Sequence, residues 1–266
     1  MGGSSRADAK GVVVHEESPF TYGRVGRATL VTLPAFFEAL SQRLAVHQSL
    51  YEWAAASPQP RALQGRGVVY VTTVDECNTT VVVRHSWHGG LFAPMTGDRF
   101  LAPTRAPREA AANVLLRTHG VPTPELIGYA LYPAGPGMRR VDVVSRFVPD
   151  AWDFGAVLAN AAPTIDRQSA CRAILPLLTQ LAAVGAVHPD LNVKNILLVR
   201  DEAQHLHAWV LDVDVVSFRP VAVESIMALN VQRLTRSIRK WHRRQEVPLD
   251  ERWLTGFGKA ALAATP

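Results

Sequence analysis

The chain has 266 residues, of which 48% are hydrophobic, so it can bury a real core in one two-lobed unit or two small domains. Its net charge of +5 favours an anionic partner, which could be nucleic acid, anionic lipid or a phosphorylated glycolipid. No apolar run reaches the ~18 residues of a membrane span, and the isolated Cys77 and Cys171 show no metal-ligand spacing and predict no structural disulfide.

The N-terminal part of the chain is predicted to contain a mostly helical segment and one β-hairpin. Residues 1–18 are polar and are expected to be loose. Apolar residues at helical spacing predict that residues 33–53 are mostly helical. Two later runs of strong β-formers, residues 68–74 and 79–84, predict the paired strands of the hairpin.

The hairpin carries two candidate phosphate-binding features. Gly65, Arg66 and Gly67 precede it, and glycines let backbone amides approach a phosphate closely, although an ordinary turn fits the same residues. Alternation in the second strand places Val82 and Arg84 on one face. Arg84 is therefore either a charged fork for phosphates or an exposed strand-end arginine. The opposite face carries Val81, Val83 and His85.

A helix predicted over residues 104–118 offers a partner for this arginine. Pro107 suits its first turn, and Gly120 follows as its end. Glu109 lies early in the helix, where it either complements the helix dipole or forms an ion pair that orients Arg84.

The chain is predicted to divide after a strand over residues 141–148. A mostly helical half follows, beginning with a helix over residues 166–184. We therefore expect an α+β fold with an N-lobe over residues 19–148 and a C-lobe over residues 149–266.

The segment after that helix carries three oxygen-bearing side chains at an informative spacing. Asp190 and Asn195 belong to His188-Pro-Asp-Leu-Asn-Val-Lys-Asn195, which is close to the protein-kinase catalytic loop, whose Asp takes a hydroxyl proton and whose Asn holds magnesium. Apolar runs after Asn195 and before Asp212 predict a hairpin, so these two residues should meet at one end. Such oxygens suit Mg²⁺ and predict phosphoryl transfer, although solvated carboxylates at a hairpin end would give the same pattern.

The last predicted helix, residues 224–244, has one apolar face and a basic remainder. The cations are Arg233, Arg236, Arg239, Lys240, Arg243 and Arg244. They form either the solvated side of a core-packing helix or a surface for anionic lipid or an acidic acceptor. Nucleic acid is not expected, because no aromatic residues alternate with the charges.

Together these motifs resemble the bacterial lipopolysaccharide kinase family, small relatives of the eukaryotic protein kinases, and within it the 3-deoxy-D-manno-octulosonic acid (Kdo) kinases. The resemblance covers about residues 60–244 and rests on Gly65-Arg-Gly67, Arg84-His85, Gly89-Gly90, Arg108-Glu109, Val121-Pro-Thr-Pro124, the segments around Asp190 and Asp212, and Asn230 to Lys240. It implies a two-lobed protein-kinase-like fold, with an antiparallel N-lobe sheet, one key helix and a reduced, mostly helical C-lobe.

The resemblance also implies a role for each candidate residue. Asp190 would be the catalytic base, with Lys194 beside it in the catalytic set. The residues implied for Mg²⁺ are Asn195, Asp212 and Asp214. The residues implied for ATP are Gly65, Arg66, Gly67, Arg84 and Glu109.

The implied acceptor is the 4-hydroxyl of a Kdo sugar on the lipid A precursor. This acceptor lies at the cytoplasmic face of the inner membrane, so the resemblance implies a cytoplasmic protein that is peripheral at that membrane. Two departures from the family pattern, Ser86-Trp-His88 and residues 145–150, leave the acceptor and the lobe junction open. No Ala-Pro-Glu motif follows Asp214, which favours a small-molecule or glycolipid acceptor over a protein.

Three alternatives stay open at this point. The chain could phosphorylate another acceptor, such as a core heptose, another small molecule or a protein. It could be a nucleotide-binding pseudokinase, since the usual strand lysine is replaced by Arg84. It could also be a basic nucleic-acid-binding module whose motif match is chance.

Overall fold

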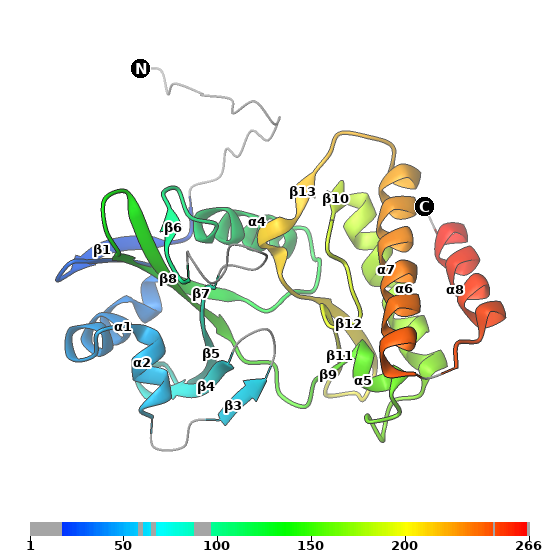
Figure 1. The fold of residues 1–266 in the computed structure, drawn as a ribbon, viewed down its shortest axis with the longest axis horizontal. Helices are drawn as coiled ribbons and strands as arrows, with labels where there is room; N and C mark the ends of the chain where they lie inside the picture. The colour runs from blue at the N-terminus through cyan, green and yellow to red at the C-terminus, as the bar shows by residue number, and fades with distance from the viewer. Residues whose placement is uncertain (1–17, 58–60, 65–67, 88–96, 247, 265–266) are drawn as a thin grey trace. The chain divides into compact units, whose positions relative to one another are not determined.

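The computed structural model describes residues 18–57, 61–64, 68–87, 97–246 and 248–264. The chain divides into two units (Figure 1). A sheet unit comprises Glu17–Asn113 and Pro124–Phe147, and a mostly helical unit comprises Val114–Thr123 and Val148–Pro266. The predicted loose segment, residues 1–18, lies outside the described residues except for Ser18.

The sheet unit is built on one antiparallel sheet with the strand order β1-β2-β7-β8-β5-β4-β3, and β6 pairs with β8 (Figure 1). Its strands are β1 (Thr21–Val25), β2 (Ala28–Thr32), β3 (Arg61–Gln64), β4 (Val68–Val74), β5 (Thr79–His85), β6 (Phe100–Leu101), β7 (Leu126–Pro133) and β8 (Met138–Arg146). The predicted hairpin is confirmed as β4 and β5. Asn78 closes its turn in the left-handed conformation, with φ 44°.

Helices lie on both faces of this sheet. The helices are α1 (Pro34–Val46), α2 (Leu50–Ala55) and α4 (Ala106–Thr118). One core cluster joins α1 and α2 to one face, and another joins the start of α4 to the other face. In β5 the fully buried Val81 and Val83 belong to the α1–α2 side. Strand alternation therefore places Arg84 on the α4 side and His85 on the α1–α2 side.

Two predicted elements of this unit have different bounds. The mostly helical segment predicted over residues 33–53 is present as two helices, because Ser49 caps a new helix by accepting a hydrogen bond from the Glu52 N–H at 3.0 Å. The strand predicted over residues 141–148 begins earlier, at Met138, because its N-terminal half pairs with β7. β7 itself was not predicted, since it is buried on both faces and shows no alternation of polar and apolar residues.

The helical unit contains the predicted helices almost at their predicted bounds. Its helices are α5 (Phe154–Leu158), α6 (Arg167–Ala183), α7 (Val223–Gln245) and α8 (Glu251–Ala263). Asp166 caps α6 by accepting from the Ser169 N–H at 2.8 Å. Pro176 lies inside α6 without ending it. The predicted apolar residues of α7 are all buried.

Short strands complete the helical unit. They are β9 (Trp152–Asp153), β10 (Ala186–Val187), β11 (Ile196–Arg200), β12 (Leu206–Val210) and β13 (Ser217–Phe218). Residues 188–195, which resemble the kinase catalytic loop, are called the catalytic segment. The predicted hairpin after this segment is confirmed as β11 and β12, and β9 pairs with β11. The fold is α+β, as predicted. In the described parts of the chain, no helix combines the length and the apolar character needed to cross a membrane.

Candidate active site

The β11–β12 hairpin brings Asn195 and Asp212 to the same end. Ile196 is the register partner of Val210, so Asn195 lies opposite Leu211. The Leu211 N–H donates to the Asn195 carbonyl at 2.9 Å, and Asp212 follows directly. The hairpin geometry expected from the sequence is therefore present.

The backbone of Asp212 is held in an uncommon conformation. Its φ of 54° and ψ of 47° lie in the left-handed region, which few residues other than glycine adopt. Leu211 is fixed on both sides, since its carbonyl also accepts from His188 Nε2 at 2.9 Å. His188 is fully buried and must carry its proton on Nε2, because a carbonyl can only accept. A backbone strained in this way and held by its neighbours is common at functional sites.

The catalytic segment folds back on the carbonyl of Asp190. Asn192 Nδ2 and Asn195 Nδ2 both donate to this carbonyl at 3.0 Å. Asn195 is mostly buried, and its Oδ1 accepts no hydrogen bond from the described residues. The amide oxygen of Asn195 and the carboxylate of Asp212 are therefore hard oxygen donors of the kind that Mg²⁺ prefers. Asp214 lies just beyond, in the 3₁₀ turn η2 (Val213–Val215).

Helix α7 anchors this segment through two polar side chains. Asn230 is fully buried, and its Oδ1 accepts from the His188 N–H at 3.0 Å. Its Nδ2 donates to the Ala186 carbonyl at 2.9 Å. Further along the helix, Ser237 Oγ accepts from the Val193 N–H at 3.1 Å. The catalytic segment is thus fastened to one rigid helix near its beginning and again near its end.

The sheet unit supplies a separate pair of charged residues. Arg84 Nη2 on β5 forms an ion pair with Glu109 Oε1 in the first turn of α4. Glu109 is buried, so this ion pair is shielded from solvent on the carboxylate side. The predicted ion pair is present, whereas Gly65, Arg66 and Gly67 lie outside the described residues.

Residues 50–253 match the family model described as Lipopolysaccharide kinase (Kdo/WaaP) family. The chain belongs to this family. As a member of a kinase family it is a phosphotransferase, as the sequence predicts.

Relatives of this lipopolysaccharide kinase carry the name 3-deoxy-D-manno-octulosonic acid kinase. The Mannheimia succiniciproducens protein is 27% identical over 209 residues, which are 76% of this chain and 84% of the relative. The Actinobacillus succinogenes protein is 30% identical over 182 residues, covering 66% and 73% respectively. A solved structure of WaaP in complex with acyl carrier protein matches 80% of this chain and 91% of that chain, with a TM-score of 0.45 and 16% identity.

Lys194 of the lipopolysaccharide kinase has a partner that the sequence did not reveal. Its Nζ lies 3.0 and 3.1 Å from the two carboxylate oxygens of Asp153. Asp153 also caps α5 by accepting from the Ala156 N–H at 2.9 Å. The ammonium group, predicted for the catalytic set, therefore ties the catalytic segment to the start of α5.

Sequence reasoning also missed the anchoring roles of Asn230 and Ser237. The available signal was an asparagine within the apolar stripe of a helix, because a buried amide must find partners for both ends. For Asp153 only the local capping bond to the Ala156 N–H could be expected from the sequence, since its pairing with Lys194 is set by the fold.

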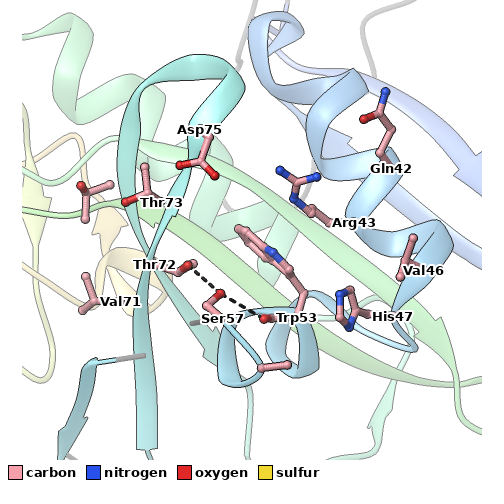
Figure 2. Close-up of a pocket in the computed structure, with 12 residues that line it drawn as sticks. Gln42, Arg43, Val46, His47, Trp53, Ser57, Val71, Thr72, Thr73 and Asp75 are labelled. Atoms are coloured by element: carbon pink, nitrogen blue, oxygen red, sulfur yellow. Dashed lines mark hydrogen bonds between the residues drawn. The ribbon is translucent and has the colours of Figure 1, made fainter. Parts of the chain in front are cut away.

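A hollow of about 840 Å³ lies in the sheet unit between α1, the end of α2 and β4 (Figure 2). Arg43 and Asp75 are among its polar lining residues, and Ser57 and Thr72 form a hydrogen bond in its wall at 2.7 Å. Neither residue of the Arg84–Glu109 pair lines it. Among the described residues, the hollow is therefore separate from this candidate ion pair of the sheet unit.

Proposed function

We propose that this lipopolysaccharide kinase transfers the γ-phosphoryl group of ATP to the 4-hydroxyl of a Kdo sugar on the lipid A precursor. The observation that carries the proposal is the catalytic segment, in which Asp190 lies on a loop fastened to α7 and Asn195 and Asp212 meet at a hairpin end. Family membership and the naming of the relatives support a sugar of the lipopolysaccharide as the acceptor.

In the proposed reaction the acceptor oxygen attacks the γ-phosphorus in line with the leaving ADP. Asp190 accepts the proton of the acceptor hydroxyl. Asn195 and Asp212 would hold Mg²⁺, which neutralises charge on the phosphates when bound. Arg84, oriented by Glu109, would bind phosphate oxygens. Catalysis then comes mainly from positioning and charge neutralisation.

The remaining predicted residues have lesser parts in this proposal. Asp214 would be a further acidic residue of the metal set, and Lys194 would keep the catalytic segment in place through Asp153. The glycine loop at residues 65–67 would cover the ATP phosphates.

The experiment that tests the function is mass spectrometry of a Kdo-bearing lipid A precursor after incubation with the protein and Mg-ATP. We expect the acceptor to gain one phosphoryl group. No gain, with ATP still bound, would contradict the acceptor and favour a different sugar, a protein or a pseudokinase role. A core heptose acceptor tested in parallel separates the first of these.

We also propose that α7 contacts an anionic membrane, which would place the enzyme at the cytoplasmic face of the inner membrane. Five exposed cations lie within roughly a third of the helix circumference at 3.6 residues per turn. They are Arg233, Arg236, Lys240, Arg243 and Arg244. None of the five has an ion-pair partner among the described residues. Arg239 differs, because it pairs with Glu251 at 3.1 Å.

Neutralising two of these cations should weaken membrane binding. The variant Arg236→Gln/Lys240→Gln is expected to bind vesicles of phosphatidylglycerol and phosphatidylcholine about 30-fold more weakly, since each cation near an anionic surface contributes about 1 kcal/mol. The measurement is vesicle sedimentation at low salt. The control Arg24→Gln/Arg27→Gln removes the same charge from the β1–β2 turn, and its binding should change little. Equal losses of vesicle binding in the two variants would show that net charge, and not the position of the cations on α7, determines the binding.

A further inference from the structure

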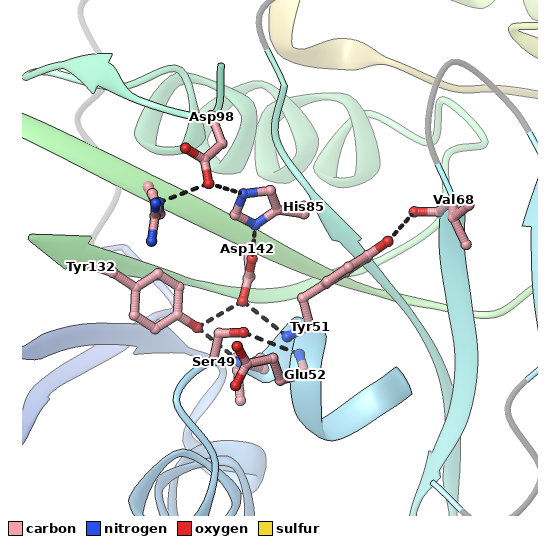
Figure 3. Close-up of polar contacts among 10 residues, drawn as sticks. Ser49, Tyr51, Glu52, Val68, His85, Asp98, Tyr132 and Asp142 are labelled. Atoms are coloured by element: carbon pink, nitrogen blue, oxygen red, sulfur yellow. Dashed lines mark hydrogen bonds and ion pairs between the residues drawn. The ribbon is translucent and has the colours of Figure 1, made fainter. Parts of the chain in front are cut away.

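His85 follows Arg84 on β5 and lies on the opposite face of the sheet, toward α2 (Figure 3). The ring is only 10% exposed. Its Nδ1 lies 2.6 Å from Asp142 Oδ1, and its Nε2 lies 3.1 Å from Asp98 Oδ2. Carboxylates accept hydrogen bonds, and a neutral imidazole has one N–H to donate. The ring can satisfy both carboxylates only as the imidazolium.

Asp142 is the centre of a wider network (Figure 3). It is fully buried on β8, yet its second oxygen accepts from the Tyr132 hydroxyl at 2.8 Å and from the Tyr51 N–H at 2.9 Å. The Tyr132 oxygen in turn accepts from the Leu50 N–H at 2.9 Å. The buried carboxylate therefore joins the start of α2 to β5, β7 and β8.

The charges of this network alternate from the surface to the core. Arg140 pairs with Asp98 at 2.7 Å, Asp98 with His85, and His85 with Asp142. Removing one member would leave a buried charge without its partner, which is more damaging than the net worth of an ion pair suggests. These ion pairs therefore hold the four charged side chains in one fixed arrangement.

The register between β5 and β8 determines on which face of the sheet Arg84 lies. His85 is the register partner of Asp142, and Arg84 is the register partner of Val143. A slip of one residue between β5 and β8 would move Arg84 to the other face of the sheet, away from Glu109. Together with the buried Val81 and Val83, the ion pair on the α1–α2 side therefore favours the strand register on which the Arg84–Glu109 pair on the α4 side depends.

We propose that His85, held as an imidazolium between Asp142 and Asp98, is the positioning residue of Arg84. This inference rests on the proposed role of Arg84 in binding the ATP phosphates. His85 itself touches neither ATP nor acceptor in this proposal, since both ring nitrogens are engaged on the α1–α2 side. Its contribution passes through the strand to the neighbouring guanidinium group.

A double-mutant cycle separates positioning from general stability. The four proteins are wild type, His85→Asn, Arg84→Gln and the double variant, and the readout is kcat/KM for ATP. His85→Asn should lower kcat/KM by about 10- to 100-fold in the wild-type background, because small misplacements of a binding group have effects of this size. In the Arg84→Gln background the same change should have less than about a twofold further effect. Equal losses in both backgrounds would overturn the proposal.

The pH profile provides a second readout. Burial lowers the pKa of His85, but the hydrogen bonds and charges of Asp142 and Asp98 outweigh it, so the pKa is raised above its ordinary value. The favourable interaction is complete below about pH 6.5 and is lost as the pH rises through the raised pKa. Wild-type kcat/KM should fall as the pH rises through this raised pKa, and Arg84→Gln should not show the fall.

Other aromatic and charged side chains lie close to this network. The Tyr51 ring lies 5.6 Å from His85, and burial raises the pKa of both Tyr51 and Tyr132, so these phenols keep their protons over the same range. Trp87 packs edge-on against His85 and does not titrate. Arg140 stays charged.

Asp98→Asn is the variant to use should His85→Asn fail to fold. It leaves the buried His85–Asp142 pair intact and removes one of the two carboxylates that raise the histidine pKa, so the fall in kcat/KM should move to lower pH. An unchanged profile would overturn the proposal. His207→Asn is the matched control, because His207 pairs with Asp201 at 2.9 Å on the exposed end of the β11–β12 hairpin.

The outcome also separates this inference from the proposed function. If the wild type transfers no phosphoryl group to the Kdo acceptor, the same cycle is measured on the Kd of Mg-ATP by calorimetry. Non-additive losses of Mg-ATP affinity in this cycle would support the positioning role of His85. Only the assignment of the acceptor would then be wrong. A wild-type protein that binds no ATP would overturn both.

Discussion

Replacing Asp190 by Asn is expected to lower kcat by about 10²- to 10⁴-fold while Mg-ATP still binds with near wild-type affinity. Asparagine has the same shape as aspartate but cannot accept the proton of the acceptor hydroxyl. The loop should keep its fold, since the substitution retains the backbone carbonyl of residue 190 that accepts from Asn192 and Asn195. Single-turnover transfer and calorimetry of Mg-ATP binding measure the two quantities separately.

The matched control for this variant is Asp201→Asn. Asp201 is another exposed aspartate of the helical unit, but it lies in the β11–β12 loop and bonds to His205 and His207. Its replacement should leave kcat at the wild-type level. A wild-type transfer rate in Asp190→Asn would show that Asp190 is not the base.

Replacing Asp212 should abolish the dependence of ATP binding on magnesium. Even partners outside the metal's own ligand set contribute about 10- to 100-fold to metal affinity, so loss of a ligand should weaken Mg-ATP binding by at least about 10²-fold. The affinity measured in EDTA should change little, because the carboxylate acts through the metal. Calorimetry with Mg²⁺ and with EDTA gives both values.

Two variants at this position separate charge from backbone strain. Asp212→Asn keeps a residue type that tolerates the left-handed conformation, whereas Asp212→Ala must adopt φ 54° without that tolerance. Both variants should lose the magnesium-dependent binding of ATP, and the alanine variant should in addition unfold at a lower denaturant concentration. Retention of magnesium dependence in both variants would remove Asp212 from the metal set.

The elements that could be predicted are those whose pattern is local. The β4–β5 hairpin, α6, α7 and the β11–β12 hairpin each have a period or a turn signal within one short window. The meeting of Asn195 with Asp212 followed from antiparallel pairing alone. The Arg84–Glu109 pair required knowledge of which helix covers which face, and the family resemblance supplied it.

What could not be predicted depends on distant partners. Nothing near Asp142 in the sequence indicates that a carboxylate inside a strand will be fully buried and bound by His85 and Tyr132. The break between α1 and α2 depends on the Ser49 cap, which competes with a continuous apolar helical pattern. Lys194 lies shortly after Asp190, the predicted base, in the sequence, but its partner Asp153 lies 41 residues away in the chain.

The two sides of helix α7 are under different constraints: one side carries the anchoring residues, and the other carries the exposed cations. Asn230 and Ser237 must keep their spacing to the catalytic segment, so an insertion or deletion between them would rotate one of them away from its backbone partner. The five exposed cations named above, unlike Arg239 with its partner Glu251, carry no such requirement and can be replaced without disturbing either anchor. Point substitutions at these positions could therefore change the proposed attraction of this enzyme to an anionic surface, whereas the number of residues between the two anchors has to stay fixed.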